Sequence, residues 1–365
     1  HYCITSPTPY SLRFMTEHTS MQQGNSNYQV AIWLLVVCAL VFTMVVVGGL
    51  TRLTGSGLSM VEWQPATGFI PPLSEAEWQE TFDKYRQFPE FININRDMDL
   101  AGFKDIFWLE FIHRVLGRII GLAFLLPFLY FLARRMIPAK LTPRMILMFA
   151  LGGMQGVLGW YMVKSGLVDD THVSQYRLTA HLMLAVMIYA LMFWTALGLL
   201  PGNRKDAGDD SGWNRLAWPA ILLTLLVALT MSSGGLVAGL KAGLVYNTFP
   251  LMGDALIAPG VYAAAPWYAA AFEDAITVQF NHRLLAIVTF ILIVVFWLRA
   301  RKATLPDGTG MAMQLMLGMA MVQVALGITT LIMRVPVQLG AAHQAGALLL
   351  LTSLLIVVHR LVSNR

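Results

Sequence analysis

Eight apolar runs, each long enough to cross a lipid bilayer, constrain this chain more than any other feature of its sequence. A transmembrane helix needs about 20 predominantly apolar residues. Only 12% of the 365 residues are charged, whereas soluble domains carry roughly 25%. We therefore predict an all-α polytopic membrane protein with eight transmembrane helices. The runs lie at 29–50, 108–132, 144–163, 179–200, 217–239, 277–298, 311–333 and 339–361.

Basic residues mark one side of the predicted bundle. Segments rich in Lys and Arg next to a span face the cytoplasm or the matrix. Such segments follow the second, fourth, sixth and eighth spans, as at Arg134, Arg204, Arg299 and Arg360. The pattern predicts that both termini are inside and that the acidic loop 51–106 is outside. The net charge of +5 is then explained by topology and requires no nucleic-acid partner.

The two halves of the chain resemble each other. The first span ends in VVVGGLTRLTGSGL and the fifth in MSSGGLVAGLKAGL, while EFIHRVLGRIIG opens the second span and QFNHRLLAIVTF the sixth. Four spans per repeat make the duplication parallel, so we predict two four-helix bundles. The expected division is a polar tail at 1–28, a first unit at 29–200, an inner linker at 201–215 and a second unit at 216–365.

Four histidines occupy equivalent places at the start of the even-numbered spans: His113, His181, His282 and His343. In the predicted topology every even span begins outside, so each unit has two histidines near the outer face. Two imidazoles at one depth on separate helices suit a bis-histidine haem. We interpret the four as axial ligands of haem iron. A structural histidine is the alternative for each one alone, and zinc would need further ligands that neither unit supplies.

Small and basic residues accompany these histidines. We expect the glycines to let helices approach each other or a flat ring; they are Gly117, Gly121, Gly156, Gly159 and Gly327. The arginines suit haem propionates as charge partners, with interfacial snorkelling as the alternative; they are Arg114, Arg118, Arg177 and Arg283.

One carboxylate distinguishes the first unit from the second. Alignment of the two His-Arg pairs places Glu110 opposite Gln279, one turn before His113 on the same helix face. A carboxylate beside a haem can position water, move protons or stabilise a cation at the ring edge. The alternative is that Glu110 only pairs with Arg114, four residues later. A pure electron-transfer protein would not need this asymmetry.

Taken together, the motifs resemble those of the haem A synthase family. They are GGLTRLTGSGLSMVEWQPATGFIPP at 48–72, EFIHR, RLTAHL, NHR and AAHQ. The resemblance covers about 29 to 361. The two cysteines, Cys3 and Cys38, do not form the outer-loop pair found in one branch, so the chain is similar to the proteobacterial and mitochondrial branch.

This resemblance implies an activity and a role for each site. The family oxidises the C8 methyl of haem O to a formyl group, through successive hydroxylations and dehydration, and so makes haem A for cytochrome c oxidase. His113 and His181 would hold the substrate haem O, with Glu110 as the catalytic carboxylate. His282 and His343 would ligate a permanent haem b.

The resemblance also implies surroundings and partners. We expect a multi-pass protein in a bacterial or mitochondrial inner membrane, in contact with lipid, with its haem sites near the outer side. A haem O synthase and an electron-transfer protein are the implied partners, and the sequence leaves a homo-oligomer open. Two other functions remain open too: a di-haem b-type, quinol-linked electron carrier, and a haem transporter or chaperone.

Overall fold

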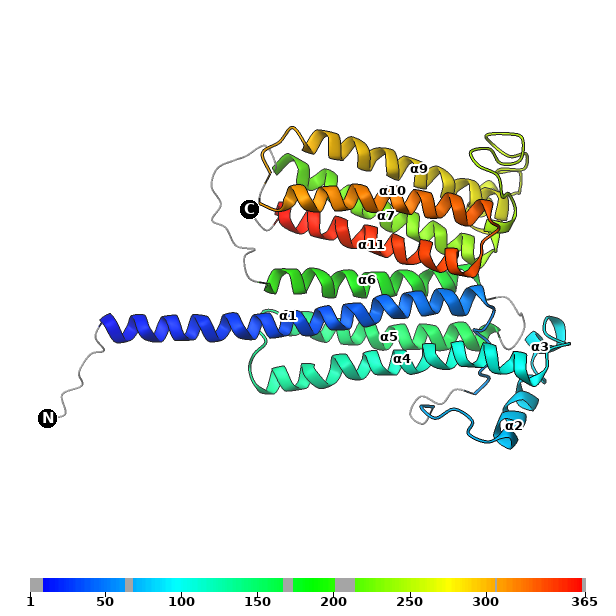
Figure 1. The fold of residues 1–365 in the computed structure, drawn as a ribbon, viewed down its shortest axis with the longest axis horizontal. Helices are drawn as coiled ribbons and strands as arrows, with labels where there is room; N and C mark the ends of the chain where they lie inside the picture. Colours follow the sequence, from blue (N-terminus) through cyan, green and yellow to red (C-terminus); the bar gives the residue numbers. More distant parts are fainter. Residues whose placement is uncertain (1–8, 63–67, 167–172, 201–213, 306, 363–365) are drawn as a thin grey trace.

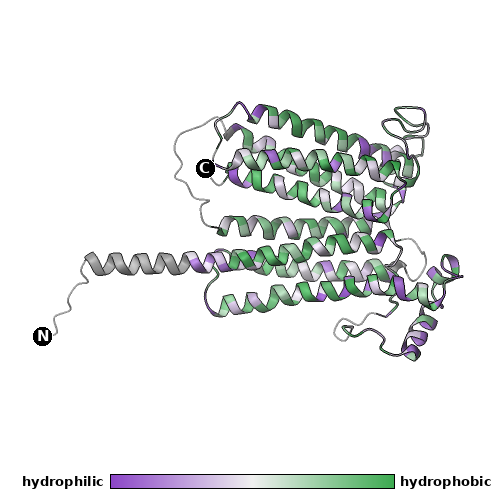
Figure 2. Cartoon of the chain, in the orientation of Figure 1, coloured by the Kyte–Doolittle hydropathy of each residue, from purple (hydrophilic) through white to green (hydrophobic). Residues whose placement is uncertain are grey.

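The computed structural model describes residues 9–62, 68–166, 173–200, 214–305 and 307–362. The prediction of eight spans is confirmed within this part of the chain, because eight helices are long and apolar enough to cross a membrane. Figure 2 shows the apolar residues running along them. The eight are α1 (Pro9–Leu53), α4 (Leu100–Ala133), α5 (Thr142–Gly166), α6 (Gln175–Leu199), α7 (Asn214–Gly239), α9 (Ala275–Ala300), α10 (Thr309–Ile332) and α11 (Val337–Val362).

The helices pack in two groups that follow the two halves of the chain (Figure 1). In the first group, α1 and α5 each contact both α4 and α6, so α4 and α6 stand at opposite corners of a four-helix ring. In the second group, α7 and α10 each contact both α9 and α11 in the same way. The groups meet where α6 packs on α7 and α1 packs on α11.

Both the start of α1 and the end of α11 lie at one end of the bundle (Figure 1). The segments between α1 and α4 and between α7 and α9 lie at the other end. The long α1 begins at Pro9, so the helix continues through much of the segment 1–28 that we expected as a polar tail. Linker residues 201–213 lie outside the described part of the chain. Which end faces the cytoplasm or matrix stays a prediction.

The segment between α1 and α4 folds onto the start of α4. Its helices are α2 (Glu75–Tyr85) and α3 (Pro89–Asn93), and a capping box of Ser74 and Glu77 begins α2. A cluster of aromatic side chains joins both helices to α4; it consists of Trp78, Phe82, Tyr85, Phe91, Phe103, Phe107 and Phe111. Helix α4 begins at Leu100, well before the predicted 108, because Asp99 caps it and its first turns pack into this cluster.

Candidate haem-binding sites

Each of the four predicted ligand histidines lies against a glycine of the preceding long helix. A Cβ added to these glycines would come to within about 3 Å of an imidazole atom, closer than an ordinary van der Waals contact. The pairs, with the distance to the nearest ring atom, are Gly48 and His113 (3.2 Å), Gly159 and His181 (3.0 Å), Gly234 and His282 (3.2 Å), and Gly327 and His343 (2.9 Å).

The two histidines of each unit approach from opposite corners of the helix ring. His113 is on α4 and His181 on α6, and these two helices are separated by α1 and α5. His282 on α9 and His343 on α11 have the same relation in the second unit. Because iron in a bis-histidine haem takes its axial ligands from opposite sides, this arrangement fits the group. The glycines provide the room that the imidazoles need.

Zinc is a poorer fit to the same residues. In the described parts of the chain, His, Cys, Asp and Glu side chains form no group of three or more that could hold a metal ion. A closed zinc site needs four ligands of these kinds, and an open one needs three. Pairs of opposed imidazoles fit a bis-histidine haem better than a zinc site.

The five glycines predicted to admit a helix or a flat ring have different surroundings. Gly159 and Gly327 do make room for a ring, but that ring is an imidazole. A Cβ on Gly117 would lie 3.1 Å from the side chain of Met44, whereas one on Gly121 or Gly156 would meet nothing within 4 Å.

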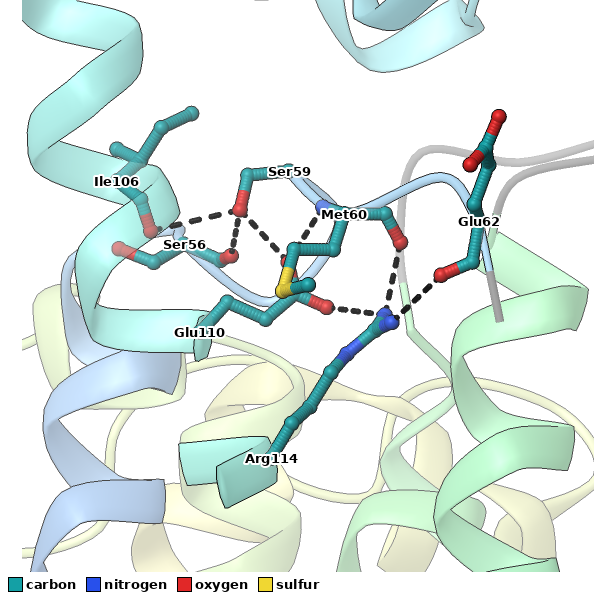
Figure 3. A network of polar contacts seen from close by, with 7 residues as sticks. All are labelled: Ser56, Ser59, Met60, Glu62, Ile106, Glu110 and Arg114. Atoms are coloured by element: carbon teal, nitrogen blue, oxygen red, sulfur yellow. Dashed lines mark hydrogen bonds and ion pairs between the residues drawn. The ribbon is translucent and has the colours of Figure 1, made fainter. Parts of the chain in front are cut away.

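Glu110, three residues before His113 on α4, is buried within a network of polar contacts (Figure 3). Its Oε2 accepts hydrogen bonds from the hydroxyl of Ser59 at 2.7 Å and from the backbone N–H of Met60 at 2.8 Å. Its Oε1 pairs with the guanidinium of Arg114 at 2.5 Å. The i,i+4 ion pair weighed as an alternative from the sequence is therefore present, together with two donors that the sequence did not indicate.

Arg114 also holds in place the segment between α1 and α4. Its guanidinium donates to the carbonyl oxygens of Met60 at 2.8 Å and Glu62 at 3.0 Å. Gly55, whose φ of 70° suits glycine, follows the end of α1 and turns the chain toward this contact. Ser59 and Glu110 are 51 residues apart in the sequence and meet because the segment between α1 and α4 folds onto α4.

The second unit repeats this arrangement without a carboxylate. The buried Gln279 donates to the carbonyl oxygen of Tyr246 at 3.0 Å. Arg283 donates to the same carbonyl at 2.8 Å and to those of Thr248 and Leu251. In both units the arginine after the histidine therefore binds the segment that follows the preceding long helix, and its predicted contact with haem propionates stays a prediction.

Comparison with known proteins identifies the family. A model of the family described as cytochrome oxidase assembly protein matches residues 31–355. The chain belongs to this family. It is 52% identical over 355 residues to the heme A synthase of Nitrosospira multiformis, an alignment that covers 96% of this chain and 99% of that protein. It is 50% identical over 336 residues to the heme A synthase of Nitrosomonas eutropha, covering 92% and 94%.

A plant protein is similar as well. The heme A synthase COX15 of Arabidopsis thaliana is 45% identical over 342 residues, covering 91% of this chain and 74% of the plant protein. Each of the three alignments extends over both helix groups of this chain. The family resemblance predicted from the motifs is confirmed.

A second buried carboxylate, which neither motif nor spacing indicated, lies near the Glu110 network. Glu90, on α3, is 7% exposed and accepts a hydrogen bond from the hydroxyl of Tyr85 at 3.4 Å. Burial raises the pKa of Glu90 to about 7, and the nearby charge of Glu110 acts in the same direction. The segment between α1 and α4 therefore contains an acidic group, Glu90, whose pKa lies near neutral pH.

The other histidines and the cysteines, together with Arg118 and Arg177, either make packing contacts or lie outside the described residues. His359 is buried with its ring edge-on to Trp194, and Cys38 is a buried free cysteine. The Arg118 guanidinium lies over the ring of Phe69 at 5.2 Å. Arg177 lies over the ring of Tyr161 and donates to its hydroxyl. His172, His1 and Cys3 lie outside the described residues, and the side chain of His18 is likewise not described.

Proposed function

We propose that this protein is a haem A synthase, a membrane enzyme that oxidises haem O to haem A. The observation that carries this function is the 45% to 52% identity to proteins of that name over nearly the whole chain. The opposed, glycine-backed histidines provide the haem-binding groups that the activity requires. The di-haem electron carrier and the haem transporter are not favoured, because bacterial and plant relatives alike carry the synthase name.

We further propose that the two units bind different haems. His113 and His181 hold the substrate haem O, and His282 and His343 hold a resident haem b, which supplies one-electron redox chemistry when bound. The difference between Glu110 and Gln279 supports this division, because the first unit has a carboxylate one turn before its ligand histidine and the second has an amide at the equivalent position. A reactive site needs such a group more than an electron-transfer site does.

Glu110 acts in this proposal as a fixed negative charge. Its two oxygens already accept from Ser59, Met60 and Arg114, and all of these partners are held by the segment between α1 and α4 or by α4 itself. These donors hold both carboxylate oxygens in one position. Such a preorganised charge lowers the energy of positive charge that develops at the edge of the substrate, and costs no reorganisation during the reaction.

The membrane setting follows from the eight spans. We propose the inner membrane of a bacterium or mitochondrion, with the basic segments inside and both haem sites near the outer side. A haem O synthase that supplies the substrate and a separate electron-transfer protein complete the reaction.

The experiment that tests this function is pigment analysis after expression with a supply of haem O. Haem A or its hydroxylated precursor in the extract, identified by mass, supports the synthase. A folded, haem-loaded protein that yields neither would refute it. Glu110→Gln keeps the size of the side chain but removes its charge, so we expect haem binding to persist while formyl formation stops. Unchanged turnover would remove Glu110 from the reaction.

A further inference from the structure

The imidazole of His282 has a hydrogen-bond partner at Nδ1. This atom is 2.8 Å from Oγ of Ser233, the residue before Gly234 on α7. Oγ of Ser233 is also 2.7 Å from the carbonyl oxygen of Thr230, to which its hydroxyl can donate. When Nε2 of His282 binds iron, its lone pair is used there and Nδ1 carries the proton. The Ser233 oxygen is placed to accept that proton's hydrogen bond while its own hydrogen is directed to Thr230.

Another contact near Ser233 joins the same two helices. The hydroxyl of Thr230 donates to the carbonyl oxygen of Leu226 at 2.9 Å and lies 2.9 Å from the hydroxyl of Thr289 on α9. Ser233 and Thr289 are both buried. These contacts connect α7 to the helix that carries His282.

The first unit has no counterpart of this serine. When the GGL sequences of the two repeats are aligned, Val47 takes the place of Ser233. A valine side chain offers His113 no acceptor. Within the described residues, Nδ1 of the other histidine of that unit, His181, is buried without a hydrogen-bond partner.

His343, the other histidine of the second unit, also differs from its equivalent His181 in having a partner at Nδ1. Gln323 places its side-chain nitrogen 3.1 Å from Nδ1 of His343 and also donates to the carbonyl oxygen of His343. Its equivalent in the first unit, Gln155, donates to the carbonyl oxygen of His181 at 3.0 Å. Both histidines of the second unit therefore have a partner at Nδ1. The Gln323 amide would have to present its oxygen to accept from Nδ1, whereas the Ser233 hydroxyl accepts there and still directs its own hydrogen to Thr230.

We propose that Ser233 is a positioning residue that secures His282 as an iron ligand and so makes the haem of the second unit a resident group. The proposal rests on the function proposed above for the second unit. A ligand histidine that donates its other N–H to an acceptor is held in one orientation and is a more basic ligand, and loss of such an acceptor typically lowers metal affinity about 10- to 100-fold. The first unit lacks this restraint on His113, which suits a haem that must enter and leave.

Three variants of the full-length protein test the proposal. Ser233→Val copies the first unit, Ser233→Thr keeps the hydroxyl, and Val47→Ser offers His113 the missing acceptor. Haem loss from purified protein is followed by transfer to apomyoglobin, and the midpoint potential of the second-unit haem is measured by spectroelectrochemical titration. We expect Ser233→Val to lose haem about 10- to 100-fold faster and to have a more positive potential, because a less basic ligand stabilises ferric iron less.

The controls separate positioning from folding. Ser233→Thr should behave like the parent protein in both measurements, and Val47→Ser should slow the loss of haem from the first unit. Parent-like retention and potential in Ser233→Val would overturn the proposal, as would equal defects in Ser233→Val and Ser233→Thr. Failure of the proposed function is seen separately, as the absence of haem A from the pigment extract while the effect of Ser233 on bound haem is still measured.

Discussion

Replacement of Gly327 by alanine should weaken haem binding in the second unit. The added Cβ would lie 2.9 Å from Cε1 of His343, whereas ordinary contacts begin at 3.4 Å. The imidazole must therefore retreat by 3.4 minus 2.9, or 0.5 Å, and the amide of Gln323 at 3.1 Å restricts that movement. Overpacking of this kind costs about 1–3 kcal/mol. At about 1.4 kcal/mol per factor of ten, haem affinity should fall about fivefold to 150-fold.

The assay is the haem content of purified protein, measured as the pyridine haemochrome, together with the rate of transfer to apomyoglobin. Gly318→Ala is the matched control, because a Cβ there meets nothing within 4 Å. Gly318 precedes Gly327 by two and a half helical turns, so it lies on the opposite side of α10. If Gly327→Ala retained as much haem as Gly318→Ala, with the same absorption spectrum, the close imidazole–glycine contact would not exist in the loaded enzyme.

Three further changes test other parts of the structure by thermal or chemical unfolding. Ser59→Ala removes a donor from the buried Glu110 carboxylate, so stability should fall by about 1–3 kcal/mol; an unchanged unfolding curve would contradict the network. Because the pKa of Glu90 is raised from 4.5 to about 7, its contribution is complete below pH 4.5 and is lost as pH rises to 7. The parent should therefore lose about 3 kcal/mol over that range relative to Glu90→Gln, and parallel pH profiles would refute this. A Cβ on Gly239 would lie 2.5 Å from Cα of Gln175, so Gly239→Ala should force α6 and α7 apart and cost about 1–3 kcal/mol; Gly310→Ala, which meets nothing within 4 Å, is its control.

Several features of the site followed from the sequence because they depend on local pattern. Apolar runs of span length predict helices wherever they occur, and the structure has all eight. The repeat placed His113, His181, His282 and His343 in equivalent positions, and each was found against a glycine. The contrast between Glu110 and Gln279 was also visible by alignment alone.

Other features depended on contacts between residues far apart in the chain. Arg114 and Arg283 bind carbonyl groups of the segments that follow α1 and α7, contacts that their positions beside histidines did not indicate. Ser59 belongs to a segment whose motif was recognisable, but its contact with Glu110 arises only when the aromatic cluster folds that segment onto α4. Hydropathy cannot predict such a contact, because it measures each residue's preference for lipid and not its partner.

The sequence by itself determined the membrane class and the eight helices, since these follow from length and hydropathy, and its internal similarity singled out the four histidines. The tertiary structure decided what surrounds each histidine. The GGL sequences occur in both repeats, but only packing shows that Gly48 and Gly234 lie against imidazoles and that Ser233 bonds to Nδ1 of His282. The physical reason is that a ligand's orientation depends on hydrogen bonds between helices, and helix packing sets their geometry.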